Sequence, residues 1–131
     1  MSLRVLDQDG RAVVIRHPKL GISTYPGGHI EGEDDLIEEA RREFEEETGI
    51  DANLIELPSR IPVAVGVHEI PASAETLAHL HFDLLFEGVA RAGIVDFPSP
   101  EGIECVWCRD EDLRATYRTL SRSVRPDEYT F

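Results

Sequence analysis

The sequence predicts an α/β fold in which helices cover both faces of one sheet. Short aliphatic runs typical of strands alternate with two segments of helical spacing, and we find no internal repeat. Strands mixed with two helices favour a layered arrangement around one core. With 131 residues the chain can bury one such core but has no room for a second, so we expect a single domain spanning residues 1–131.

The first strand is predicted around residues 13–15, where Val13, Val14 and Ile15 form a continuous apolar run typical of a buried strand. This strand lies close to the start of the chain. We therefore expect any strand before it to be short or missing, and residues 1–3 to be a remnant of an expression vector.

The clearest predicted helix lies between Asp35 and Gly49. Asp35 is a favourable N-cap, and Glu38 three residues later completes a pair that resembles a capping box. Gly49 suits the left-handed position after a helix, with Ile50 available for the hydrophobic contact that often follows. Helical spacing gives the segment one apolar face, formed by Leu36, Ile37, Ala40 and Phe44.

Three carboxylates of this helix stand three and four residues apart, at Glu43, Glu46 and Glu47. Like charges at these spacings destabilise an isolated helix by roughly 0.2–0.5 kcal/mol per pair. Glu43 and Glu47 fall at the border of the apolar face, whereas Glu38 and Glu45 project toward water. A divalent cation that gathers the carboxylates would offset their repulsion, so the pattern indicates a metal site.

Two other interpretations of the acidic run, a solvated face and a calcium-binding loop, fit the sequence less well. Most charge runs are simply solvated faces, but such a face does not need carboxylates beside the apolar stripe. The alternating oxygen ligands and central glycine of an EF-hand calcium loop are missing. Carboxylates that leave coordination positions open for water and phosphates suit Mg²⁺ or Mn²⁺.

Further strands are predicted at residues 61–67, despite Pro62, and at residues 77–86. In the second of these, period-2 alternation puts Leu80, Phe82, Leu84 and Phe86 on one face, and His79, His81 and Asp83 on the other. For the histidines we favour lining of a substrate cleft, or hydrogen bonding inside the core, over metal ligation. A second helix is predicted at residues 110–120, with Asp110 as its cap.

Residues 28–50 resemble the signature of the Nudix (MutT-like) hydrolases, G-x5-E-x7-R-E-U-x-E-E-x-G-U, where U is a bulky apolar residue. The chain supplies Gly28, Asp34 in place of the first Glu, Arg42, Glu43, Phe44, Glu46, Glu47, Gly49 and Ile50. The resemblance extends more weakly over residues 11–120. It implies an α/β/α sandwich with a mixed β-sheet, and a metal-dependent hydrolase that cleaves the diphosphate linkage of a nucleoside diphosphate joined to another group.

The resemblance also implies roles for individual residues. The carbonyl of Gly28 and the carboxylates of Glu43, Glu46 and Glu47 would hold Mg²⁺ or Mn²⁺, and Arg42 would orient the carboxylates. Beside Glu46, Glu47 and Arg42, the catalytic set would include a further acid from the loop before the final strand. For this base or extra ligand we prefer Glu101 to Glu104 and to the carboxylates of the helix.

The support of Arg42 has two candidates. Keeping the helix register matches Asp34 to the first Glu of the signature, whereas matching the preceding loop selects Glu33. We favour Asp34, because the helix register fixes the metal ligands and a loop can absorb a one-residue change.

The resemblance implies a small nucleotide-type substrate, for which Tyr25 would offer a stacking surface beside the glycines and His79 and His81 would offer polar contacts. Two alternatives remain open. A Nudix-like domain can bind a nucleotide or ADP-ribose as a sensor without cleaving it, although the intact carboxylates favour an enzyme. A prenyl diphosphate isomerase on the same fold would need Cys105 or Cys108 in the cleft.

Composition limits the partners and the location of the protein. A formal net charge of −13 argues against non-specific binding of nucleic-acid polymers, which requires basic surface. The sequence contains no signal peptide and no apolar stretch long enough to span a bilayer, so we expect a cytoplasmic protein that does not bind membranes. Cys105 and Cys108 are expected to be packing thiols, since residues three apart on a strand face opposite ways. A homodimer is left open.

Overall fold

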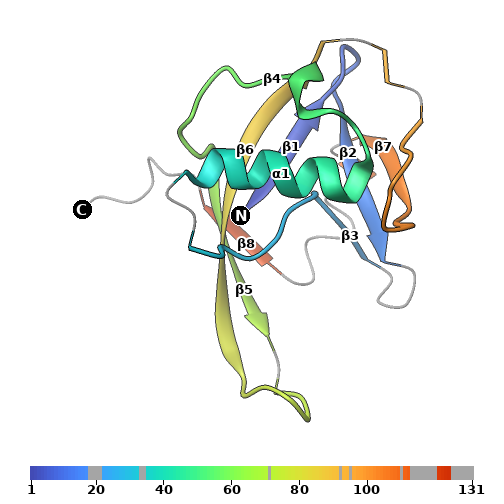
Figure 1. The fold of residues 1–131 in the computed structure, drawn as a ribbon. Helices are drawn as coiled ribbons and strands as arrows, with labels where there is room; N and C mark the ends of the chain where they lie inside the picture. Colours follow the sequence, from blue (N-terminus) through green and yellow to red (C-terminus); the bar gives the residue numbers. More distant parts are fainter. Residues whose placement is uncertain are drawn as a thin grey trace.

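The computed structural model describes residues 1–17, 22–32, 35–70, 72–91, 93–94, 96–109, 111–112 and 121–124. In this part of the chain, eight strands form one sheet, and one α-helix lies across a face of it (Figure 1). The strands are β1 Ser2–Leu6, β2 Arg11–His17, β3 Ile22–Thr24, β4 Ile55–Glu56, β5 Ala64–Ile70, β6 His79–Ala90, β7 Cys105–Arg109 and β8 Ser121–Val124. The helix α1 spans Leu36–Thr48, and a short 3₁₀ turn, η1, spans Ala52–Leu54.

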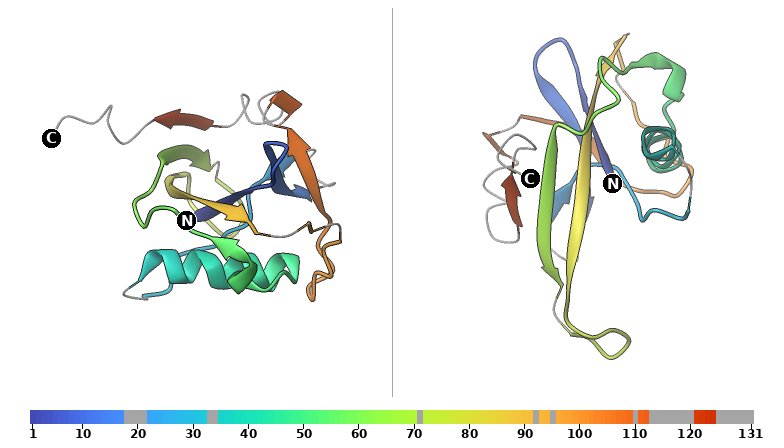
Figure 2. Two further views of the ribbon diagram at one scale, coloured as in Figure 1. Left: turned by 90° about the horizontal axis from the view of Figure 1, so that it is seen from above. Right: turned by 90° about the vertical axis from the view of Figure 1, so that its left-hand side faces the viewer.

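The sheet is mixed. Its main order is β3-β2-β1-β6-β5-β8, with β7 paired to β2 and β4 paired to β6. Strands β1 and β6 run parallel, and the other pairs are antiparallel. An end-on view of α1 shows the helix on one side of the sheet and β8 on the other (Figure 2). The predicted α/β class with a mixed sheet is confirmed.

Helix α1 begins and ends as its sequence predicts. The Asp35 side chain accepts hydrogen bonds from the amides of Ile37 at 3.2 Å and Glu38 at 3.4 Å. Gly49 adopts a φ of 76° and donates its amide to the Glu45 carbonyl at 2.8 Å, which closes the last turn. A side chain here would be strained by this φ and would also meet the Pro98 carbonyl oxygen at 2.4 Å. The loop after β6 therefore packs closely against the end of the helix.

The core fills the space between α1 and the sheet. Ile37, Ala40 and Phe44 of the helix are buried, in agreement with the predicted apolar face. They belong to one cluster with residues from three parts of the sheet, namely Leu3, Val5, Val13, Phe86 and Ala90. Because this face of α1 packs against the sheet, the backbone positions of the acidic residues at its border are fixed relative to the sheet.

The start of the chain holds the glycine loop in place. The amide of Leu3 donates to the Pro26 carbonyl at 2.9 Å, and the amide of Gly28 donates to the Met1 carbonyl at 3.1 Å. The Met1 amino group donates to the Gly28 carbonyl at 3.0 Å and pairs with Asp83 at 3.1 Å. These contacts place Gly28 where the sheet meets the helix.

Two predictions about strands need correction. The opening strand is neither short nor missing, because residues 2–6 form β1 and Leu3 is fully buried in the core. Strand β5 begins at Ala64, so Ile61, Pro62 and Val63 lie before it. Proline lacks the amide needed for a ladder hydrogen bond, which explains the later start. In the predicted second helix, Glu111 and Asp112 are helical, and residues 110 and 113–120 lie outside the described residues.

Strands β5 and β6 form a long hairpin whose far end extends beyond the helix (Figure 1). On the face of β6 that turns toward α1, Phe86 is buried, but Phe82 and Leu80 nearer the tip are 64% and 56% exposed. The predicted alternation is correct, yet only the part of the face under α1 is covered. No helix in the described part of the chain is long and apolar enough to cross a membrane.

Candidate functional site

The glycine loop lies directly against the acidic side of α1. A Cβ atom on Gly28 would come within 2.6 Å of the Glu43 carboxyl carbon, so the Glu43 side chain fills the space that a side chain at Gly28 would need. One turn further along the helix, Glu47 Oε1 accepts a hydrogen bond from the Gly27 amide at 2.9 Å. The structure thus brings Gly28, Glu43 and Glu47 together from two separate segments.

The surroundings of Glu43 and Glu47 penalise their charged forms. Burial raises the pKa of Glu47 to about 7, against the opposing effect of the Gly27 hydrogen bond and with added repulsion from Glu43, Glu101 and Glu46. Burial also raises the pKa of Glu43, while Arg42 acts in the opposite direction. A group of partly desolvated carboxylates that repel one another is a place where a cation is stabilised.

Arg42 binds three carboxylates of its own helix. Its Nη1 donates to Glu46 Oε1 at 2.6 Å and its Nη2 donates to Glu43 Oε1 at 2.9 Å. Its Nε donates to Glu39 Oε2 at 3.1 Å, and its Nη2 also contacts the other Glu39 oxygen. These hydrogen bonds lower the pKa of Glu39 and raise that of Arg42. Arg42 thereby supplies part of the counter-charge that the acidic run needs.

Glu39 was missed by sequence reasoning. Its side chain is only 3% exposed, although it carries a charge. The available signal was its position three residues before Arg42, a spacing at which a carboxylate and a guanidinium meet on a helix. The two residues predicted to support Arg42, Asp34 and Glu33, lie outside the described residues.

The residues present fit a divalent cation. Among the side chains that the structure describes, no three His, Cys, Asp or Glu residues already converge as a coordination sphere. The donors are nevertheless the hard oxygens that Mg²⁺ and Mn²⁺ prefer, and Gly28 leaves open space for the Glu43 carboxylate beside its own backbone. Glu43 and Glu46 are held by Arg42, so a metal ion would share them with the guanidinium.

Glu101 and Glu104 lie in different surroundings. Glu101 sits in a turn closed by hydrogen bonds to Ser99, from the Gly102 amide at 3.1 Å and the Ile103 amide at 3.0 Å. It is close enough to Glu47 to raise the pKa of that carboxyl. Glu104 instead lies 3.5 Å from Arg16 at an exposed position. The electrostatic link to Glu47 favours Glu101 as the additional acid.

The residues predicted to contact substrate are spread over three places. Leu3 and Val5 pack under α1, so alternation along β1 puts Arg4 on the opposite face of the sheet, where its guanidinium lies 6.0 Å from the centre of the Tyr25 ring. His81 stacks on His29, the residue after Gly28, with ring centres 5.1 Å apart. His79 lies near the exposed tip of the hairpin, where its Nδ1 is 2.9 Å from the Leu77 carbonyl oxygen.

Neither cysteine is arranged as a nucleophile. Burial and the nearby Glu47 carboxylate raise the pKa of Cys105 to about 11, so its thiol stays protonated at neutral pH. The Cys105 thiol lies 3.7 Å from the Glu47 carbonyl oxygen, and the side chain packs against the core. Cys108 pairs with Ala12 in the β2–β7 ladder, and alternation gives it the opposite face. This arrangement offers no support for the isomerase alternative.

Comparison with known proteins identifies the family. The NUDIX domain model matches residues 1–127, and no curated protein is similar enough in sequence to be matched. The fold resembles that of an Ap4A hydrolase from C. elegans in a binary complex, with a TM-score of 0.67, 16% identity, and 89% and 83% of the two chains covered. It also resembles a MutT protein from Bacillus halodurans, with a TM-score of 0.54, 23% identity, and 88% and 71% covered.

A further similar structure is the NUDIX domain of NrtR from Shewanella oneidensis complexed with ADP ribose. The TM-score is 0.51 at 16% identity, with 87% of this chain and 73% of that chain covered. At such identities the likeness concerns the fold alone. The family model covers nearly the whole sequence, so the chain belongs to the Nudix family.

Proposed function

We propose that this Nudix chain is a metal-dependent pyrophosphohydrolase that cleaves the diphosphate linkage of a nucleoside diphosphate joined to another group. The observation that carries the proposal is the gathering of Glu43 and Glu47 around the Gly27–Gly28 backbone, where burial and repulsion from neighbouring carboxylates raise the pKa of both carboxyls. Such a site is stabilised by a cation and can hold a diphosphate through it, despite the negative charge of the protein.

Glu43, Glu46 and Glu47 would hold Mg²⁺ or Mn²⁺. The Gly28 carbonyl accepts a hydrogen bond from the Met1 amino group at 3.0 Å, so it would join these ligands only on release of that contact. When bound, the ion would neutralise the charge of the diphosphate and polarise the phosphorus atom. Arg42 acts as a positioning residue, because its fork fixes the carboxylates of Glu43 and Glu46.

The proposed reaction is a displacement by water. The water oxygen forms a bond to phosphorus, the bond from phosphorus to the bridging oxygen breaks, and a carboxylate takes the proton of the water. Glu101 is the preferred base, because its turn places it near Glu47 without tying its carboxylate to the helix. The bridging oxygen leaves with the second phosphate group.

A nucleotide-type substrate is supported by the similar structures, one an Ap4A hydrolase complex and one a NUDIX domain with ADP ribose. His81 is the substrate-contact candidate with the most direct link to the site, through its stacking on His29 beside Gly28. Tyr25 and His79 remain candidates for contacts with the parts of the substrate that lie further away.

The second candidate function is a sensor that binds a nucleotide or ADP-ribose without cleaving it. The NUDIX domain of NrtR in complex with ADP ribose favours keeping this candidate. The two functions differ in turnover. A binding module has no transition state to stabilise, and so has no requirement for several desolvated carboxylates around one backbone loop.

The deciding experiment is a product assay with Mg²⁺ or Mn²⁺ across nucleoside triphosphates, dinucleoside polyphosphates, ADP-ribose and nucleotide sugars, with products separated by chromatography. We expect cleavage within the phosphate chain of at least one class, and no cleavage when EDTA is added. Binding of a panel member without turnover at any metal concentration would replace the enzyme with the sensor.

A further inference from the structure

Glu39 is a charged side chain that the proposed chemistry leaves unexplained. Its side chain is only 3% exposed, although helical spacing puts Glu39 on the same side of α1 as Glu43 and Glu46, the side that faces the glycine loop. Removing a carboxylate from water is costly unless hydrogen bonds and an opposite charge compensate for it. Hydrogen bonds and an opposite charge in its surroundings must therefore stabilise the buried Glu39 carboxylate.

Arg42 provides that compensation. The two Glu39 oxygens bind two different nitrogens of the guanidinium, Nε at 3.1 Å and Nη2 in a shorter contact. A two-point contact of this kind fixes the plane of the guanidinium as well as its position. Because the Arg42 side chain is 42% exposed, it would otherwise be free to reorient in solvent.

The fixed guanidinium then determines where two proposed metal ligands lie. Its Nη1 donates to Glu46 and its Nη2 donates to Glu43. If Glu39 did not hold Arg42, the guanidinium could follow these two carboxylates and compete with a metal ion for them. Through Arg42, Glu39 can therefore influence the metal ligands without contacting the metal ion itself.

We propose that Glu39 is the positioning residue that anchors Arg42 and thereby sets the affinity of the site for its divalent cation. The inference deepens the proposed function and rests on it. It assigns to Glu39 the support of Arg42 that the sequence suggested for Asp34 or Glu33. The same geometry predicts that the contribution of Glu39 is transmitted through Arg42 alone.

The test is calorimetric titration of the substrate-free protein with Mn²⁺ alone. Replacing Glu39→Gln should weaken Mn²⁺ binding by about tenfold or more, the range found when a side chain that orients metal ligands is removed. The matched control is Glu38→Gln, which removes the same charge one residue away, from an exposed carboxylate paired with Arg41 and Arg60. The control should bind Mn²⁺ as the wild type does. Equal Mn²⁺ affinity in Glu39→Gln and wild type would overturn the proposal.

Further variants keep the test decisive. Circular dichroism verifies that Glu39→Gln folds; if it does not, Glu39→Asp, which keeps the charge but is one methylene too short for the two-point contact, takes its place. In a double-mutant cycle with Arg42→Lys, the two losses of Mn²⁺ affinity should not add. Additive losses, or a silent Glu39→Gln beside a large loss in Asp34→Asn, would refute the route through Arg42.

The outcome is separable from the proposed activity. If the wild type binds Mn²⁺ but hydrolyses nothing, while Glu39→Gln binds the ion more weakly, the hydrolase proposal fails and the role of Glu39 stands. If the wild type hydrolyses a nucleotide and Glu39→Gln keeps full Mn²⁺ affinity, the role of Glu39 fails alone. A wild type that binds no Mn²⁺ refutes both.

Discussion

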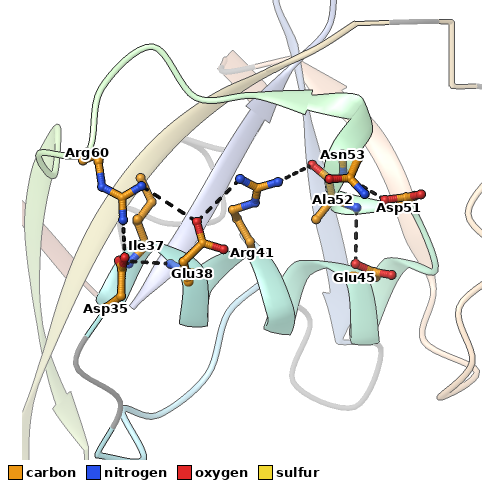
Figure 3. Close-up of polar contacts among 9 residues, drawn as sticks. All are labelled: Asp35, Ile37, Glu38, Arg41, Glu45, Asp51, Ala52, Asn53 and Arg60. Carbon is orange, nitrogen blue, oxygen red and sulfur yellow. Dashed lines mark hydrogen bonds and ion pairs between the residues drawn. The ribbon is translucent and has the colours of Figure 1, made fainter.

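The two sides of α1 carry similar numbers of charged residues but balance them differently. On the outer side, Arg60 contacts Asp35 and lies 3.8 Å from Glu38, Arg41 lies 3.6 Å from Glu38, and Glu45 accepts from the Ala52 amide at 3.3 Å (Figure 3). On the side that faces the glycine loop, Glu39, Glu43 and Glu46 share Arg42, and Glu47 accepts a backbone amide.

This contrast separates structural charges from functional ones. The outer contacts join α1 to η1 and to the segment before β5, and each acid there lies at an exposed position with a partner from these contacts. On the inner side, burial and repulsion raise the pKa of Glu43 and Glu47. Carboxylates whose negative charge is not fully balanced by nearby positive charge or hydrogen bonds are the ones suited to bind a cation.

The largest effect should come from Glu47→Gln. A metal ligand that stabilises charge developing in the transition state contributes to kcat more than to substrate binding. Each ~1.4 kcal/mol of barrier is tenfold in rate, so the loss of one close charge partner should lower kcat on the order of a hundredfold or more. Steady-state kinetics on the substrate found in the panel would measure this. A variant that changes only Kd would indicate a binding site.

A Gly28→Ala substitution should reduce activity while preserving the fold. The added Cβ would come within 2.6 Å of the Glu43 carboxyl carbon, and the flexible end of that side chain can move away at little cost in stability. Because Glu43 would then leave its position, we expect activity to fall by about tenfold or more. Gly93→Ala is the control, since a Cβ there meets nothing within 4 Å. Equal activities in the two variants would mean that the position of Glu43 is unimportant.

Stability without metal should fall as pH rises. The pKa of Glu47 in the folded protein, about 7, lies above the ordinary value of 4.5, so its contribution to stability is complete below about pH 4.5 and is lost as pH rises through about 7. Between pH 5 and pH 8 the wild type should lose about 1–3 kcal/mol relative to Glu47→Gln. Urea denaturation at both pH values would measure it. Parallel pH profiles of the two proteins would contradict the raised pKa.

The smallest effect is expected on the outer side of α1. The side chains of Arg60 and Asp35 are 61% and 47% exposed, so the pair is screened by water. Arg60→Ala should cost less than about 1 kcal/mol and leave kcat unchanged. Thermal melting and the hydrolysis assay would check both values. A large loss of activity would show that the two sides of the helix are not independent.

Local chemistry made the helix predictable. Asp35, Gly49 and the apolar spacing each act within a few residues, and all three were read correctly from the sequence. The start of β1 was not predictable in this way, because residues 1–3 are stabilised by distant partners such as Pro26 and Phe86. The alternation along β6 was correct, but the exposure of Phe82 depends on where α1 ends over the sheet.

The same distinction applies to the site. The acids Glu43 and Glu47 could be named because their helical spacing and their border position are local properties. Glu39 could not, because its burial depends on how the helix packs, although its spacing from Arg42 was a local signal. Tyr25 was grouped with the site by its closeness in sequence to the glycines, yet it lies near Arg4 on the other face of the sheet.

The most direct test of the contrast between the two sides is the binding of Mn²⁺ followed by electron paramagnetic resonance, in which bound ion loses the sharp signal of free ion. Wild type and the outer-side double variant Glu38→Gln/Glu45→Gln should bind Mn²⁺ with equal affinity, while the inner-side double variant Glu43→Gln/Glu47→Gln should not bind it measurably. Each double variant removes two carboxylates, so the net charge of the two variants is the same. Equal binding by the inner-side and outer-side variants, or no binding by the wild type, would contradict the account.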